Sequence, residues 1–138
     1  MSELVPIPQP ELEPVTTVLV VEDEVLIRLD VAEEIRLAGL DVLEASSAEE
    51  ALDLLAAGSR VDVVFSDYQL SGTLDGWKLR SILKERHPHL HFILTSAQRP
   101  PGDVKDAQVR FFPKPYHAPS VVDAISKVTE ETDSDGST

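Results

Sequence analysis

Acidic residues and a lysine directly follow three short apolar runs of the chain. They are Glu22 and Asp23, then Asp67, and finally Lys114. If the runs are neighbouring parallel strands, their carboxyl ends meet at one edge of a sheet and bring these side chains together. Crowded carboxylates repel each other unless a divalent cation lies between them, and a lysine beside them can pair with a carboxylate or an attached phosphate. This combination indicates a phosphorylatable aspartate.

Alternating strands and helices would hold these residues in place. Continuous apolar runs predict strands buried on both faces, and apolar residues at helical spacing predict the helices between them. The expected strands cover residues 18–21, 41–45, 61–66, 90–94 and 109–112, and the expected helices cover about 25–37, 48–58, 75–86 and 120–129. This alternation predicts an α/β fold, a doubly wound five-stranded parallel sheet with helices on both faces.

One segment breaks the alternation. Between the fourth and fifth expected strands, residues 97–107 contain Pro100, Pro101 and Gly102. These residues oppose a helix through the first half of the segment. We therefore expect the fourth helix to be short or disordered.

The two ends of the chain differ in composition from its middle. Residues 1–16 contain four prolines among polar residues, which predicts an extended leader. Residues 131–138 are polar and acidic, which predicts a disordered tail. One domain covering residues 17–130 is expected between them, with no output domain after it.

Composition excludes several kinds of function. A length of 138 residues fits one domain, and a net charge of −13 opposes unaided nucleic-acid binding. The absence of cysteine excludes disulfides, thiolate zinc sites and cysteine nucleophiles. No signal peptide is visible, and no apolar run approaches the ~20 residues of a membrane helix. We expect a cytoplasmic protein with no membrane contact.

The polar residues at the strand ends resemble those of response-regulator receiver domains, the CheY-like family. The resemblance covers residues 17 to about 130, and its segments are Val-Val-Glu22-Asp23-Glu24, Val-Phe-Ser-Asp67, Ile-Leu-Thr95-Ser96-Ala97 and Lys114-Pro115. It implies the flavodoxin-like strand order 2-1-3-4-5. It also implies a stand-alone, single-domain response regulator of a bacterial two-component or phosphorelay system.

The resemblance assigns the acceptor and the metal ligands. Asp67 would take a phosphoryl group from a phosphohistidine and become an aspartyl phosphate. Asp23 and Asp67 would bind Mg²⁺ together with the backbone carbonyl of Gln69, and Glu22 would bind it through water. Mg²⁺ prefers carboxylate and carbonyl oxygens and keeps several waters.

The resemblance also assigns a response to phosphorylation. Thr95 and Lys114 would contact phosphoryl oxygens, Phe111 would be the switch aromatic, and the bond before Pro115 would be cis. The implied partners are a histidine kinase or phosphotransfer protein and a downstream protein target. The chain would not be an enzyme, although it would assist its own phosphorylation and dephosphorylation.

Each position also has a structural interpretation. Glu22 and Asp23 could cap the first helix, Asp67 could be a turn residue, Lys114 could be a solvated side chain, and Phe111 could be strand core. Chance would have to explain Glu22, Asp23, Asp67 and Lys114 together at one sheet edge, so the joint functional interpretation of these four residues is favoured. Phe111 alone is more often core.

Other conspicuous residues have ordinary explanations. The alternating His87, His89 and His91 suggest a metal site, but the intervening Pro88 favours histidines that face solvent. Trp77 is expected to be a packing anchor rather than a partner contact.

Departures from the family pattern and two rival functions stay open. Glu22 replaces the commoner aspartate, and the loop after Asp67 is one residue longer than usual, with Ser71 where proline is typical. One rival is a phospho-independent interaction module on the same fold. The other is an aspartate-nucleophile phosphatase, although such enzymes carry a second acid where this chain has Gln69.

Overall fold

The computed structural model describes residues 15–97 and 110–136, and for residues 131–136 only the backbone. Within these residues five strands form one parallel sheet in the order β2-β1-β3-β4-β5, as expected. The strands are β1 (Thr17–Val21), β2 (Asp41–Ala45), β3 (Val63–Asp67), β4 (His91–Ser96) and β5 (Arg110–Pro113). The predicted α/β doubly wound architecture and strand order are confirmed.

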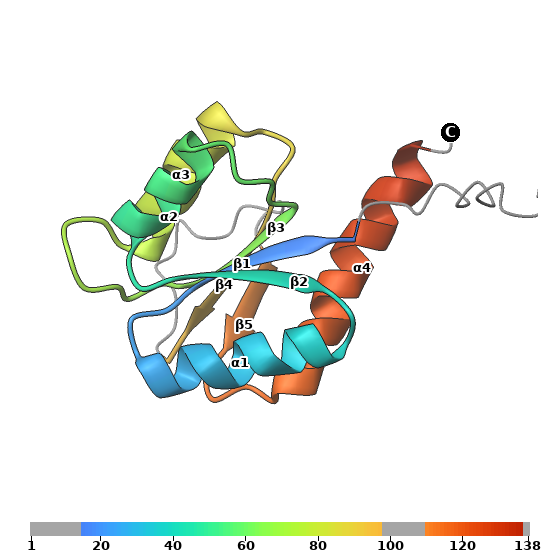
Figure 1. Ribbon diagram of the computed structural model, residues 1–138, viewed down its shortest axis with the longest axis horizontal. Helices are drawn as coiled ribbons and strands as arrows, with labels where there is room; N and C mark the ends of the chain where they lie inside the picture. The colour runs from blue at the N-terminus through green and yellow to red at the C-terminus, as the bar shows by residue number, and fades with distance from the viewer. Residues whose placement is uncertain (1–14, 98–109, 137–138) are drawn as a thin grey trace, which may run out of the picture.

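Helices cover both faces of the sheet (Figure 1). The described helices are α1 (Val25–Leu37), α2 (Ala48–Ala56), α3 (Gly76–Arg86) and α4 (Ala118–Gly136). Helices α2 and α3 pack on one face against Leu19 and Val21, while α1 and α4 pack on the other against Val18 and Val20. Alternate residues of β1 thus serve opposite cores, which explains its continuous apolar run.

The helix starts are set by different means. Ser47 caps α2 by accepting a hydrogen bond from the Glu50 N–H at 3.0 Å, and Asp75 caps α3 by accepting one from the Lys78 N–H at 2.8 Å. The cap position of α1 is Glu24, whose side chain makes no capping bond. Capping is therefore not the role of Glu22 and Asp23.

Some boundaries differ from the expected ones. Helix α4 runs to Gly136, past the expected end near Thr129, and no proline or glycine interrupts the sequence between them. Strand β3 extends through Asp67 and β4 through Ser96, one and two residues beyond their expected ends. The expected short fourth helix falls largely on residues 98–109, which lie outside the described residues, as do residues 1–14 of the expected leader.

Trp77 and the three conspicuous histidines differ in their surroundings. Trp77 is half-buried against the α2–α3 core, and the Arg80 guanidinium lies 5.2 Å from its ring centroid. His89 is exposed, whereas His87 and His91 are partly buried. The only metal-capable group found within the described residues contains no histidine.

Candidate functional site

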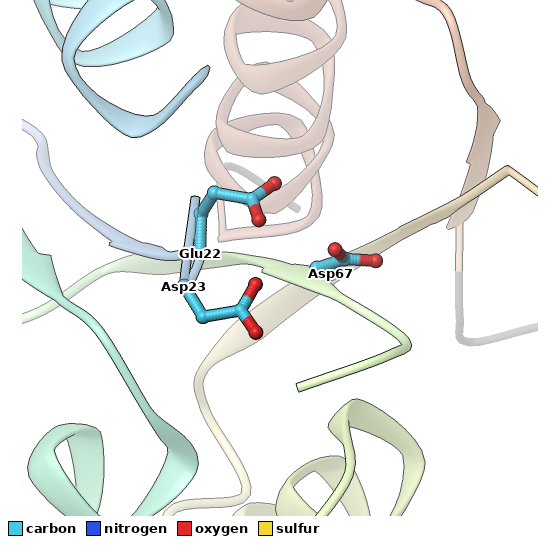
Figure 2. Close-up of side chains that lie close together, drawn as sticks. All are labelled: Glu22, Asp23 and Asp67. Carbon is cyan, nitrogen blue, oxygen red and sulfur yellow. The ribbon is translucent and has the colours of Figure 1, made fainter. Parts of the chain in front are cut away.

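The carboxyl ends of four strands bring the predicted site residues together. Glu22 and Asp23 follow β1, and Asp67 ends β3. Thr95 lies in β4, directly paired with Asp67 in the sheet register, and Lys114 follows β5. Figure 2 shows the three carboxylates gathered at this edge. The predicted convergence of these residues is therefore present.

Lys114 joins two of the acidic residues. Its Nζ donates to Glu22 Oε1 and to Asp67 Oδ2, each at 2.9 Å. The peptide bond between Lys114 and Pro115 is cis, as the resemblance implied, and the Lys114 N–H donates to the Ser96 carbonyl at 2.9 Å. Asp67 and Lys114 thus lie on the same rim of the molecule.

Burial and charge act in opposite directions on these groups. Glu22 is only 3% exposed, and this burial raises the pKa of its carboxyl, as does the charge of Asp67, while the hydrogen bond from Lys114 lowers it. Burial lowers the pKa of Lys114, but its bonds to Glu22 and Asp67 outweigh that effect and raise the pKa well above its usual value. Lys114 is therefore a cation at neutral pH.

The carboxylates form a donor set for a metal ion. Glu22, Asp23 and Asp67 each offer an oxygen, and these oxygens lie within 4.8 Å of one another. Asp23 and Asp67 border a hollow of about 480 Å³ that Gln69 and Lys114 also help to line. Three carboxylates face one ammonium, so the cluster keeps an excess of negative charge. The oxygen donors and the open hollow fit a hydrated divalent cation such as Mg²⁺.

Backbone amides fix the orientation of the carboxylates. The Gln69 N–H donates to Asp67 Oδ1 at 3.2 Å, and the Glu24 N–H donates to Glu22 Oε2 at 3.2 Å. The Ser71 N–H donates to Asp23 Oδ2 at 3.1 Å. The long loop after β3 therefore touches both Asp67 and Asp23.

Thr95 carries a hydroxyl without a hydrogen bond. The residue is 1% exposed, and its Oγ1 has no partner among the described residues. Buried hydroxyls are normally paired, because an unpaired one costs about 1–3 kcal/mol. The hydroxyl therefore has unused bonding capacity on the strand next to Asp67.

Phe111 lies against the core. It pairs with Leu94 in the register and is half-buried against the α2–α3 core. This placement agrees with the strand-core interpretation, and the switch role stays a prediction.

The sequence did not indicate three further residues near the site. Glu49 of α2 and Thr73 of the loop are joined by hydrogen bonds, yet a first-turn acid and a loop threonine are ordinary in themselves. Tyr116 buries its hydroxyl without a partner among the described residues, and burial raises its pKa to about 12. A tyrosine that follows Lys114-Pro115 gives no sequence signal that its hydroxyl would be buried and unpaired.

Comparisons with known proteins agree with this geometry. The sequence profile of the family described as "Response regulator receiver domain" matches residues 18–126. The chain therefore belongs to the response regulator receiver domain family, the class of domain found in two-component signalling.

Two curated relatives contain similar segments. The chain is 32% identical over 122 residues to "Sensor kinase CckA" of Brucella abortus (strain 2308), covering 85% of this chain and 13% of that protein. It is 29% identical over 114 residues to "Response regulator protein FleR" of Pseudomonas aeruginosa, covering 80% of this chain and 24% of that protein. The chain thus spans less than a quarter of the length of either relative.

A solved structure has the same fold. The "response regulator receiver domain protein (CheY-like)" from Methanospirillum hungatei JF-1 superposes with a TM-score of 0.81, covering 88% of this chain and 99% of that one. At 17% identity this likeness concerns the fold alone. Within the described residues, no helix is both long and apolar enough to cross a bilayer.

Proposed function

We propose that this chain accepts a phosphoryl group on Asp67 from a histidine kinase or a phosphotransfer protein, with Mg²⁺ as cofactor. The observation that carries the proposal is the bridge from Lys114 to Asp67 and Glu22, within a cluster of three carboxylates. A structural ion pair would need one carboxylate, whereas this cluster retains excess negative charge that a cation would neutralise.

The transfer exchanges one bond for another. A carboxylate oxygen of Asp67 attacks the phosphorus of a phosphohistidine, an O–P bond forms as the N–P bond breaks, and the imidazole leaves with that electron pair. Asp23, Asp67 and the Gln69 carbonyl would hold Mg²⁺, with Glu22 acting through water. When bound, the ion neutralises charge on the phosphoryl oxygens, which is the main requirement of such chemistry.

Lys114 and Thr95 then stabilise the product. The Lys114 ammonium has three donors, so it can bind a phosphoryl oxygen while keeping a bond to Glu22. The unpaired Thr95 hydroxyl would donate to another phosphoryl oxygen. Because Thr95 is paired with Phe112 of β5, its movement would also disturb that strand, including Phe111, and so alter the protein's surface.

The proposed output is protein binding that depends on phosphorylation. Helix α1 begins two residues after the acidic pair and exposes several large apolar side chains, namely Val25, Leu26, Leu29 and Leu37. Leu26 is 81% exposed, and it helps line a hollow of about 640 Å³ together with Lys114 and Tyr116. An apolar surface beside the acceptor supports contact with another protein.

Phosphorylation of an asparagine variant tests the acceptor. Incubation with acetyl phosphate and Mg²⁺ should add one phosphoryl group to the wild-type chain, as measured by intact mass. Asp67→Asn should gain none, because an amide oxygen is too weak a nucleophile, and chelation of Mg²⁺ should suppress the wild-type gain. An Asp67→Asn chain that gains the same mass would refute the assignment.

Two other functions predict different results. A phospho-independent module would show unchanged backbone amide resonances when a beryllofluoride phosphoryl analogue and Mg²⁺ are added. A phosphatase would turn over a generic phosphomonoester repeatedly, whereas we propose an acceptor that is not an enzyme. Gln69, where such phosphatases carry an acid, supports the acceptor.

A further inference from the structure

Two carboxylates from outside the loop hold the segment that follows β3. Asp23 Oδ2 accepts the Ser71 N–H at 3.1 Å, close to the acidic cluster. Thr73 lies two residues after Ser71 in the loop. Its N–H donates to Glu49 Oε2 at 3.2 Å, and its hydroxyl donates to the same oxygen at 2.7 Å. Asp23 and Glu49 come from different elements, so the loop ties the end of β1 to the first turn of α2.

Gly72 makes this double attachment possible. Its φ is +106°, a conformation that favours glycine, and a Cβ there would lie 3.1 Å from Glu49 Oε1. Glu49 therefore packs directly over the turn that separates Ser71 from Thr73. The hydrogen bonds from Thr73 also lower the pKa of the Glu49 carboxyl, so it is ionised when it accepts them.

We propose that Glu49 is a positioning residue for the metal site. By holding Thr73 it fixes the turn at Gly72, which keeps the Ser71 N–H aimed at Asp23 and keeps that carboxylate facing the cluster. Glu49 itself is not among the grouped metal-capable side chains, so it acts through the loop. The inference rests on the proposed function, because it assumes that Asp23 binds Mg²⁺.

The composition of the loop explains why it needs such contacts. Residues 68–74 contain no proline, so the backbone of the loop has more conformational freedom to lose when it becomes ordered. Hydrogen bonds to a charged acceptor are about twice as strong as neutral ones and can restrict that freedom. Partners that orient a metal ligand from outside the metal's coordination sphere typically change affinity by about 10–100-fold.

A matched pair of variants tests the proposal. Glu49→Ala removes the contact to Thr73, while Glu50→Ala removes a carboxylate from the same helical turn that instead accepts from the Ser46 N–H and hydroxyl. Calorimetric titration with Mg²⁺ should show about tenfold weaker binding for Glu49→Ala. Glu50→Ala should stay within about twofold of wild type, because its bonds do not touch the loop. Urea unfolding in EDTA reports stability separately.

Variants at Thr73 supply the second readout. Thr73→Ala should weaken Mg²⁺ binding as Glu49→Ala does, and Thr73→Ser should restore it. The double variant Glu49→Ala/Thr73→Ala should bind Mg²⁺ no more weakly than the single variant with the lower affinity, because both changes remove the same contact. In EDTA, the Ser71 amide resonance should shift in Glu49→Ala but not in Glu50→Ala. The role of Glu49 would be refuted if Glu49→Ala bound Mg²⁺ as tightly as wild type, or if Glu50→Ala lost as much Mg²⁺ affinity as Glu49→Ala. Neither result would affect the proposed function. A wild-type chain that binds no Mg²⁺ would overturn the proposed function and this inference with it.

Discussion

The two halves of the sheet edge differ in how fully their polar groups are paired. On the β1–β3 half, Glu22, Asp23 and Asp67 all accept hydrogen bonds, from Lys114 or from backbone amides. On the β4–β5 half, the hydroxyls of Thr95 and Tyr116 are buried with no partner among the described residues. In the first half every carboxylate already has a hydrogen-bond partner, whereas the second half retains unused hydroxyl donors.

This difference indicates a division of labour at one site. A paired, rigid set of carboxylates is suited to binding because little reorganisation is needed when a cation arrives. An unpaired buried hydroxyl destabilises the resting fold, so a new acceptor nearby would be strongly favoured. The binding half and the responding half are neighbouring strands, which supports coupling between them.

Asp23→Asn should have the largest effect, and it should act on the binding half. We expect Mg²⁺ affinity to fall by about 100-fold or more, because Asp23 is a proposed direct ligand and the loss of partners outside the coordination sphere already costs about 10–100-fold. In EDTA the same variant should be more stable, by about 1 kcal/mol, because one of three repelling carboxylates is gone. Its amide oxygen can still accept the Ser71 N–H. Calorimetry and urea unfolding measure the two effects.

The control for that variant is Asp53→Asn, an exposed acid on α2 that lies outside the cluster. It should leave both Mg²⁺ affinity and stability in EDTA close to wild type. If Asp23→Asn bound Mg²⁺ as tightly as wild type, the binding half would have been assigned wrongly.

Thr95→Val should separate binding from response. The variant loses an unpaired buried hydroxyl, so the resting fold should gain about 1 kcal/mol in urea unfolding. Amide resonances of β5 should no longer shift when beryllofluoride and Mg²⁺ are added, whereas Thr95→Ser should keep the shift. Persistence of the full β5 shift in Thr95→Val would remove the responding role from this hydroxyl.

Tyr116→Phe should have the smallest effect. Removing its unpaired hydroxyl should raise stability by about 0.5 kcal/mol, with Mg²⁺ affinity unchanged. Burial raises the pKa of Tyr116 to about 12, so the variant should lose the tyrosinate absorbance that appears near that pH. A loss of stability in Tyr116→Phe would show that the hydroxyl has a partner, and the contrast between the two halves would then rest on Thr95 alone.

Much of the fold was predictable because its signals are local. The run 18–21 is apolar at every position, as a strand covered on both faces must be, and it forms β1, an interior strand of the sheet. The convergence of Glu22, Asp23, Asp67 and Lys114 followed from parallel strands ending at one edge. The end of α4 was wrong by several residues, because helix length after the last apolar turn depends on weak propensities.

The sequence by itself determined the order of strands and helices and the residues that meet at the sheet edge, because periodicity and strand polarity are properties of neighbouring residues. Only the tertiary structure decided which groups are paired there. Asp23 meets Ser71 across 48 positions and Glu49 meets Thr73 across 24, while Thr95 meets no partner among the described residues. Such outcomes depend on how whole elements pack, since a hydrogen bond requires atoms to meet within about 3 Å.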